Sequence, residues 1–141
     1  MAITQAICSS FKQEVLEGLH DFASGGDTFK IALYTSSASL DSTTTAYTSS
    51  NETTGTGYTA GGQTLTSQSV TLSGTTAYID FGDASWTSST ISAAGALIYN
   101  STNANRAVCV LNFGGTYSST NGTFTVQFPA ATTTTAILIL N

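Results

Sequence analysis

The side chains that could do chemistry in this sequence are few and widely spaced. His20 is the only histidine, and a Ser/His/Asp site can be drawn around it only because serine and aspartate are common in the chain. No nucleophile motif accompanies it. His20 falls on the polar side of a predicted helix, so we interpret it as a solvated surface residue. Cys8 and Cys109 have no CxxC spacing, which predicts two free, buried thiols and neither a disulfide framework nor a zinc site.

The acidic side chains offer two further kinds of site. Asp80 and Asp83 could bind a cation, but Ca²⁺ usually takes about six to eight oxygen ligands. Glycoside cleavage needs two carboxylates across a cleft, and Asp41, Glu52, Asp80 and Asp83 are the candidates outside the helical region. Neither pattern is specific. The sequence therefore predicts no catalytic residue, no metal site and no cofactor, and favours a protein that is not an enzyme.

A glycine-rich stretch, GTGYTAGG, runs from Gly55 to Gly62. It resembles a phosphate-binding loop only superficially, because no lysine follows it and no amphipathic helix pattern begins after it. We interpret this stretch as a flexible turn.

The composition is polar without being charged. Apolar residues make up 40% of the 141 residues and charged residues 8%, and about a third of the chain is serine or threonine. Such a surface carries little charge repulsion and favours dense lattices or fibres; an ordinary secreted β protein is the alternative. The net charge is −5 and the cations are Lys12, Lys30 and Arg106, which disfavours nucleic-acid binding. No segment has the ~20 apolar residues of a membrane span, and no signal peptide is recognisable at the amino terminus.

Two apolar segments, Gly95 to Asn100 and Arg106 to Phe113, are joined by the small polar residues Ser101 to Asn105. Both segments are rich in β-branched and aromatic residues, so this region predicts a β-hairpin. Apolar residues point to both sides of the second segment. We therefore expect both faces of the hairpin to be covered, as in the centre of a sheet.

Apolar residues recur at intervals of three or four from Ile3 to Phe22, which is the pattern of one side of an amphipathic helix. Thr4 is the predicted N-cap and Ser24 to Gly26 the predicted stop. We expect this N-terminal helix, within residues 1–24, to pack on the sheet or to dock on a neighbouring subunit. Its apolar stripe consists of Ile3, Ile7, Phe11, Val15, Leu19 and Phe22.

The rest of the chain predicts short strands. Thr28 to Thr35 alternates as a strand with one buried face, whereas Ser36 to Gly62 is nearly devoid of aliphatic residues and predicts a long excursion with a short strand at Thr45 to Ser50. Further strands are predicted at Gln63 to Leu72, Thr75 to Gly82, Trp86 to Ile91, Gly122 to Phe128 and Thr135 to Leu140. Together these elements predict a single, mainly β domain over residues 1–141: an antiparallel sandwich or barrel of about eight to nine strands with one N-terminal helix.

The alternation of each segment also predicts its buried side chains. The expected core consists of Ile7, Phe11, Val15, Leu19, Phe29, Ile31, Leu33, Leu97, Cys109, Leu111, Phe124 and Val126.

Several stretches that together cover most of the chain carry a family resemblance. In order they are SFKQEVLEGLHDF, DTFKIALYTSSASL, TGTGYTAGGQTL, GALIYN followed by NRAVCVLNFGG, and STNGTFTVQFP. Taken together, they resemble a family of small virion structural proteins of tailed bacteriophages. The resemblance implies a component of the virion, assembled in the host cytoplasm with other virion proteins as partners, and it carries no catalytic residue.

From this resemblance we expect a capsid decoration or cement protein that binds the outside of the head in many copies. The alternative is a tail, neck or fibre-associated structural or adhesion module, and an enzyme such as a glycan hydrolase is the third class. The partner would be the major capsid protein or a tail or neck protein, and the chain is expected to form homo-oligomers. The excursion from Ser36 to Gly62 could add strands to a neighbour without desolvating charge. The interface residues predicted there are Tyr47, Asn51, Tyr58 and Thr59.

Overall fold

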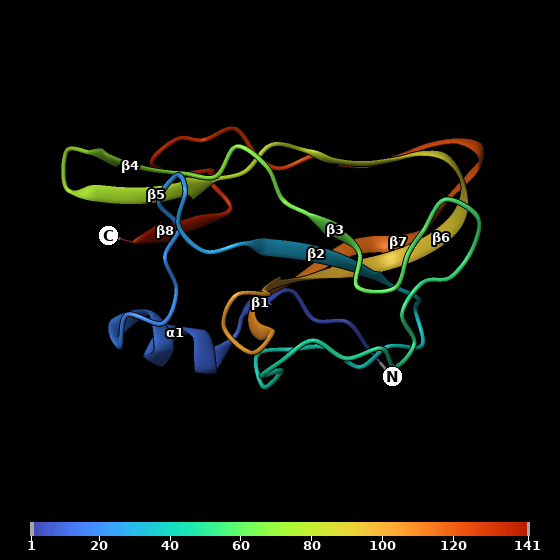
Figure 1. The fold of residues 1–141 in the computed structure, drawn as a ribbon, viewed down its shortest axis with the longest axis horizontal. Coiled ribbons are helices and arrows are strands. Elements are labelled where there is room, and N and C mark those ends of the chain that lie inside the picture. Colours follow the sequence, from blue (N-terminus) through green and yellow to red (C-terminus); the bar gives the residue numbers. More distant parts are fainter. Residues whose placement is uncertain (1, 141) are drawn as a thin grey trace.

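The computed structural model describes residues 2–140, which form two antiparallel sheets and a short helix (Figure 1). The first sheet has the strand order β1-β7-β6-β2-β3 and the second the order β4-β5-β8. Of the two architectures that the sequence left open, the structure therefore has the one with two separate sheets. The elements are β1 (Ala6–Ile7), α1 (Ser9–Leu16), β2 (Phe29–Tyr34), β3 (Gln63–Thr64), β4 (Ser69–Ser73), β5 (Thr76–Asp80), β6 (Ala84–Asn100), β7 (Arg106–Val126) and β8 (Leu138–Leu140).

Strands β6 and β7 form the predicted hairpin and extend well beyond it. The turn covers residues 101–105, and Asn100 pairs with Arg106 directly beside it. Ala104 and Asn105 both have φ of 54°, the left-handed conformation that tight turns use. The stretch from Ala93 to Asn100 is buried, which confirms that both faces are covered there.

The β6–β7 ribbon bends sharply halfway along its length. Ala93 pairs with Tyr117 and Gly95 with Asn112, so that one residue of β6 lies opposite residues 113–116 of β7. An insertion of this kind turns a ribbon strongly, and the turn is visible at the right of Figure 1. The predicted strands Trp86 to Ile91 and Gly122 to Phe128 are therefore not separate elements, because both belong largely to the far half of this ribbon.

Strand β2 lies beside β6 and runs through the core. Phe29, Ile31 and Leu33 are fully buried, but so are Ala32 and Tyr34. The prediction of a single buried face was wrong because the segment after β2 folds back over the other face. Phe29 stacks on Phe22 with a ring-centroid distance of 4.2 Å.

The N-terminal helix is shorter than predicted. Helix α1 covers Ser9–Leu16, and the residue before it, Cys8, makes no side-chain cap, so the predicted cap at Thr4 was wrong. The backbone before the helix is extended: β1 pairs with β7, and the Thr4 N–H donates to the Leu40 carbonyl. A spacing of four residues, as between Ile3 and Ile7, places side chains on the same side of a strand as well as of a helix. This ambiguity explains the error.

The predicted apolar stripe is accordingly buried only in part. Phe11 in α1 is buried, and so is Phe22, which lies in the loop after the helix. Ile7 and Val15 each remain 37% exposed, so their assignment to the core was wrong. Leu19 is half-buried. Among the other predicted core residues, Leu111 is half-buried, and the rest are buried.

The long excursion from Ser36 to Gly62 packs against the chain's own sheet. It has no regular strand in the part that the structure describes; the predicted strand at Thr45 to Ser50 is reduced to an isolated bridge between Ala46 and Arg106. A second bridge joins Tyr34 to Glu52. The Thr53 N–H donates to the Leu33 carbonyl, so the excursion follows the edge of β2 and covers it.

The second sheet lies at the left of Figure 1, beyond the end of β2. The predicted strand Gln63 to Leu72 is split between β3 in the first sheet and β4 in the second. β5 falls within the predicted Thr75 to Gly82, and β8 within Thr135 to Leu140. Over residues 2–140, the structure contains no helix with the length and apolar character of a membrane span.

Candidate functional site

The polar side chains that looked most reactive in the sequence are turned inward. Glu14 and His20 are both buried, so the interpretation of His20 as a solvated residue was wrong. One Glu14 carboxylate oxygen lies 3.0 Å from His20 Nε2, and the other accepts a hydrogen bond of 2.8 Å from the Arg106 guanidinium. A buried carboxylate needs such partners to offset its desolvation. The contacts among Glu14, His20 and Arg106 therefore hold α1 and the loop after it against β7.

Asn100, at the end of β6, fixes the orientation of the His20 ring. The Asn100 side-chain oxygen accepts hydrogen bonds from the backbone N–H groups of Thr102 and Asn103, so its amide nitrogen faces His20. An amide nitrogen only donates, and His20 Nδ1, 3.1 Å away, must therefore accept. The ring proton then lies on Nε2, facing the Glu14 carboxylate. The same amide nitrogen also donates to Asp27, which ties the hairpin turn to the loop before β2.

Glu14 and His20 of this cluster, and the two cysteines, are enclosed within the fold. Both ring nitrogens of His20 are engaged within the chain. Burial, with the Asp41 and Glu14 carboxylates, raises the pKa of Cys8 to about 11, and burial raises the pKa of Cys109 to about 12. A nucleophilic cysteine requires the thiolate. Both cysteines are buried and free, as the sequence predicted.

A second buried carboxylate, Glu52, organises the excursion from Ser36 to Gly62. One of its oxygens accepts hydrogen bonds from the Tyr58 hydroxyl and the Gly61 backbone N–H, both at 2.7 Å. The other accepts from the Tyr47 hydroxyl at 2.6 Å. The Tyr99 hydroxyl of β6 donates to the Gly61 carbonyl at 2.6 Å. Hydrogen bonds to a charged acceptor are short and strong, so Glu52 holds the excursion together, and the Tyr99 hydroxyl fixes it to β6.

Gly62 shows how closely the glycine-rich stretch lies against β2. It has φ of +76°, and a Cβ built on it would lie 1.8 Å from the Ile31 carbonyl oxygen. Only glycine allows this approach. The stretch from Gly55 to Gly62, interpreted from the sequence as a flexible turn, is thus an ordered part of the cover over β2.

The predicted interface residues in this excursion do not share one surface. Tyr47 and Tyr58 are half-buried, with their hydroxyls directed inward to Glu52, whereas Asn51 and Thr59 are exposed. Burial and the Glu52 carboxylate together raise the pKa of Tyr58 well above its usual value. The two tyrosines therefore serve the internal packing of this chain.

The acidic residues considered for cation binding or glycoside cleavage have local structural partners or lie apart from any cluster. Hydrogen bonds from the side chain and backbone of Thr43 lower the pKa of Asp41. Asp83 accepts a hydrogen bond from the Phe128 N–H, and Asp80 lies opposite Ser69 between β4 and β5. Within residues 2–140, no group of three or more His, Cys, Asp or Glu side chains is placed to hold a metal ion.

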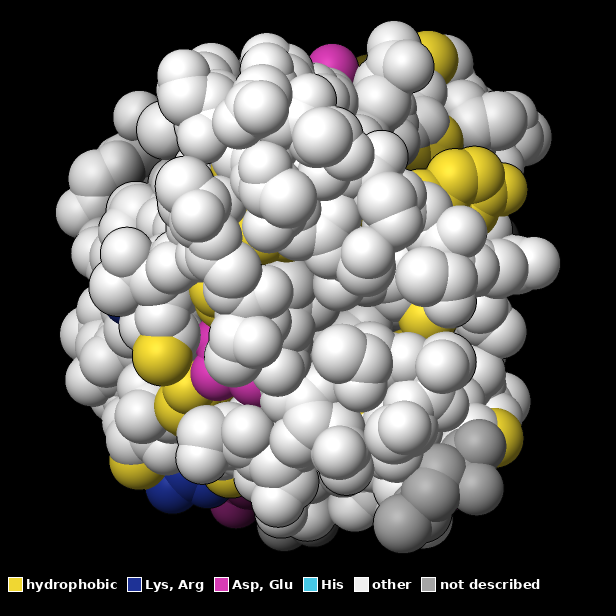
Figure 2. All heavy atoms as spheres, turned by 90° about the vertical axis from the view of Figure 1, so that its right-hand side faces the viewer, with side chains coloured by type: hydrophobic (Ala, Val, Ile, Leu, Met, Phe, Trp, Pro, Cys, Tyr) yellow, Lys and Arg dark blue, Asp and Glu magenta, His cyan; other side chains and the backbone are white. Residues whose placement is uncertain are grey.

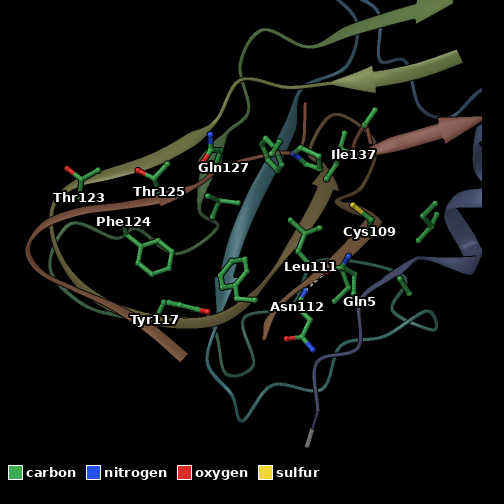
Figure 3. Close-up of a pocket in the computed structure, with 18 of the residues that line it drawn as sticks. Gln5, Cys109, Leu111, Asn112, Tyr117, Thr123, Phe124, Thr125, Gln127 and Ile137 are labelled. Atoms are coloured by element: carbon green, nitrogen blue, oxygen red, sulfur yellow. Dashed lines mark hydrogen bonds between the residues drawn. The ribbon is translucent and has the colours of Figure 1, made fainter. Parts of the chain in front are cut away.

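A groove of about 780 Å³ lies between the two halves of the bent β7 (Figure 3). Its walls combine apolar side chains such as Leu111 and Phe124 with polar ones such as Gln5, Thr123 and Gln127. Phe113 and Phe124 both line it, and their ring centroids lie 6.3 Å apart. None of the residues that line the groove is charged.

The groove exists because β7 is paired along one edge only over most of its length. On its outer side, β1 pairs with β7 at Val110 and Cys109. Beyond that point, from Phe113 to Val126, no strand among the described residues pairs with the outer edge of β7. An unpaired edge of this length is an open template for another strand.

A second exposed surface is part of one face of the sheet β4-β5-β8, beyond the place where Leu138 and Ile79 pack against the core. The strand register places Val70 and Leu72 of β4 on the same face as Leu138 and Leu140 of β8. Leu138 is buried, but Val70, Leu72 and Leu140 are 53%, 73% and 70% exposed. The outer edge of β4 is also unpaired in the described structure. Exposed apolar faces of this kind mark interaction sites.

Few charged side chains are visible at the end of the molecule that lies opposite the sheet β4-β5-β8 (Figure 2). Figure 2 shows the end of the molecule at the right of Figure 1, where the surface is almost entirely uncharged polar or backbone, with scattered apolar atoms and few charged ones. The sequence predicted this low charge. It did not predict the groove or the exposed face, because the groove depends on the bend of β7 and the face on the separation of β4 from β3.

Comparison with known proteins gives no match: no protein-family model, no curated protein and no solved structure matches this chain.

Proposed function

We propose that this protein is a non-enzymatic virion structural protein of a tailed bacteriophage, and that it decorates the capsid by binding the outside of the head in many copies. The family resemblance of the sequence motivates the virion role. The observation that carries a binding role is that the open surfaces of the chain are uncharged strand edges and apolar faces, while its buried carboxylates and histidine are held by internal partners.

A capsid lattice presents the same binding site many times. A small decoration protein that also contacts its neighbours is therefore held by several contacts at once, which raises its overall affinity. Uncharged strand edges suit this role because they form backbone hydrogen bonds without desolvating charge. The partner in this proposal is the major capsid protein.

The test is the amount of this protein in purified particles, measured by quantitative mass spectrometry against the major capsid protein. Decoration predicts a copy number comparable with that of the major capsid protein. A small, fixed number of copies would overturn decoration in favour of a tail, neck or fibre position. Absence from the particle would overturn the virion role altogether.

A further inference from the structure

We propose that the groove along β7 of one copy receives the β4–β5 hairpin of a second copy, so that the chain associates with itself head to tail. The proposal concerns the isolated chain and does not rest on the virion role. It joins the two surfaces of the molecule that lack a partner within the described chain.

The groove is shaped for a strand. It follows the outer edge of β7, where the backbone N–H and C=O groups of the segment around Thr123 and Thr125 have no neighbouring strand in the described structure. An extended segment laid along this edge would pair with those groups and cover Leu111 and Phe124 at the same time. A compact apolar ligand would cover the apolar side chains but leave the backbone groups of this edge without hydrogen-bond partners.

The occupant must also be uncharged. A charged side chain entering the groove would lose its hydration and meet no opposite charge among the lining residues. The β4–β5 hairpin meets this condition: from Ser69 to Ile79 it contains no charged residue, and Asp80 stands at the end of β5 away from the hairpin turn.

The pattern of β4 matches that of the groove. Val70 and Leu72 form its apolar side, and Ser69, Thr71 and Ser73 its polar side. The lining of the groove likewise combines apolar side chains with threonine and glutamine side chains. β4 has five residues, and a strand of that length spans roughly 17 Å, which corresponds to the run of lining residues from Thr123 to Gln127.

The contact joins two different surfaces, so each copy still has one free groove and one free hairpin after the first contact. Contacts of this type repeat until they close a ring or extend as a fibre. Association should therefore increase steadily with protein concentration.

The experiment uses sedimentation velocity of the purified full chain over a range of concentrations. Leu72→Asp places a charge on the apolar side of the hairpin, and Tyr117→Asp places one at the groove, where Tyr117 is 57% exposed. Each variant alone should remain monomeric. Thr71→Asp, on the opposite side of β4, adds the same charge and should associate as the unmodified chain does.

Mixing the two monomeric variants gives the decisive result. The Leu72→Asp chain keeps its groove and the Tyr117→Asp chain keeps its hairpin, so the mixture should form a complex of two chains and no larger species. Urea denaturation of each variant checks that it is folded.

Three results would overturn the proposal. The first is an unmodified chain that stays monomeric at every concentration, which would leave the groove to a different protein or to a neutral ligand. The second is a mixture that fails to form the pair, as expected if each surface instead binds its own copy. The third is a Thr71→Asp chain as monomeric as the Leu72→Asp chain.

Discussion

The two halves of the β6–β7 ribbon differ in what covers them. The half beside the hairpin turn is flanked by β2 on one edge and β1 on the other, and its residues Ala93 to Asn100 are buried. The far half, from Ala84 to Ser92 in β6 and from Tyr117 to Val126 in β7, has an unpaired outer edge on β7 and opens into the groove. The same ribbon thus forms the core in the half beside the turn, here called the closed half, and an accessible edge in the far half, here called the open half.

The two halves of the ribbon also differ in whether buried charged side chains lie beside them. Glu14 and Glu52 lie with the closed half, where each carboxylate oxygen has at least one hydrogen-bond donor. No charged side chain lines the groove of the open half. Charged groups inside the closed half fix loops onto the sheet, whereas the open half has an uncharged groove beside an edge with which no described strand pairs.

The largest expected effect is a fall in the stability of the folded chain at alkaline pH, caused by tyrosines in and around the closed half. Burial raises the pKa of Tyr99 to about 12 and that of Tyr34, Tyr47 and Tyr58 higher still, while an unfolded tyrosine titrates near 10. Above pH 10 the unfolded chain therefore holds fewer protons than the folded chain, so stability that is fully present below pH 10 falls as the pH rises through 12 and beyond.

Melting temperatures measured from pH 8 to pH 12 check this effect. The decline should be shallower in the Tyr99→Phe variant, which lacks one of the four groups. A melting temperature that stays constant through pH 12 would contradict the internal placement of these hydroxyls.

The next effect is that of Phe29→Ala in β2. Phe29 is fully buried and stacks on Phe22, so the substitution should lower the free energy of unfolding by about 3–5 kcal/mol through lost transfer energy and a cavity. Tyr117→Ala, on the open half, should change it by less than about 1 kcal/mol. Urea denaturation measures both, and similar values for the two would show that the ribbon is equally packed along its length.

The sequence predicted the closed half well because its signals are local. Alternation identified β2, and two apolar segments around Ser101 to Asn105 identified the hairpin with its turn. The helix was overextended because residues four apart share a side in a strand as well as in a helix.

The long-range features could not be predicted in the same way. His20 reads as a surface residue beside its polar neighbours, and its partner Asn100 lies 80 residues away. Glu52 lies in a segment rich in serine, threonine and glycine, so no local pattern indicates its partners. The hydrogen bond from Tyr99 to Gly61 forms only when the excursion folds onto β6. The groove depends on the register shift between Ala93 and Gly95, which no local pattern encodes.

A smaller effect is expected for Glu52→Gln. The glutamine loses the charge that strengthens the hydrogen bonds from Tyr47 and Tyr58, and its NH₂ group would face hydroxyl donors. The free energy of unfolding should fall by about 1.5–3 kcal/mol. Glu17→Gln is the matched control because Glu17 is exposed, and it should cost under about 0.5 kcal/mol. If both variants denature at the same urea concentration, Glu52 does not hold the excursion.

The smallest effect is expected at Leu72 of β4, and it tests the open part of the molecule most directly. Leu72 is 73% exposed, so truncation removes little buried area, and Leu72→Ala should change the free energy of unfolding by less than about 0.5 kcal/mol. The same substitution at Leu97, which is fully buried in β6, should cost about 2–5 kcal/mol. The measurement belongs at low protein concentration, because association of folded chains would add apparent stability. If Leu72→Ala costs as much as Leu97→Ala under these conditions, the apolar face of β4-β5-β8 is covered by its own chain and is not a free surface.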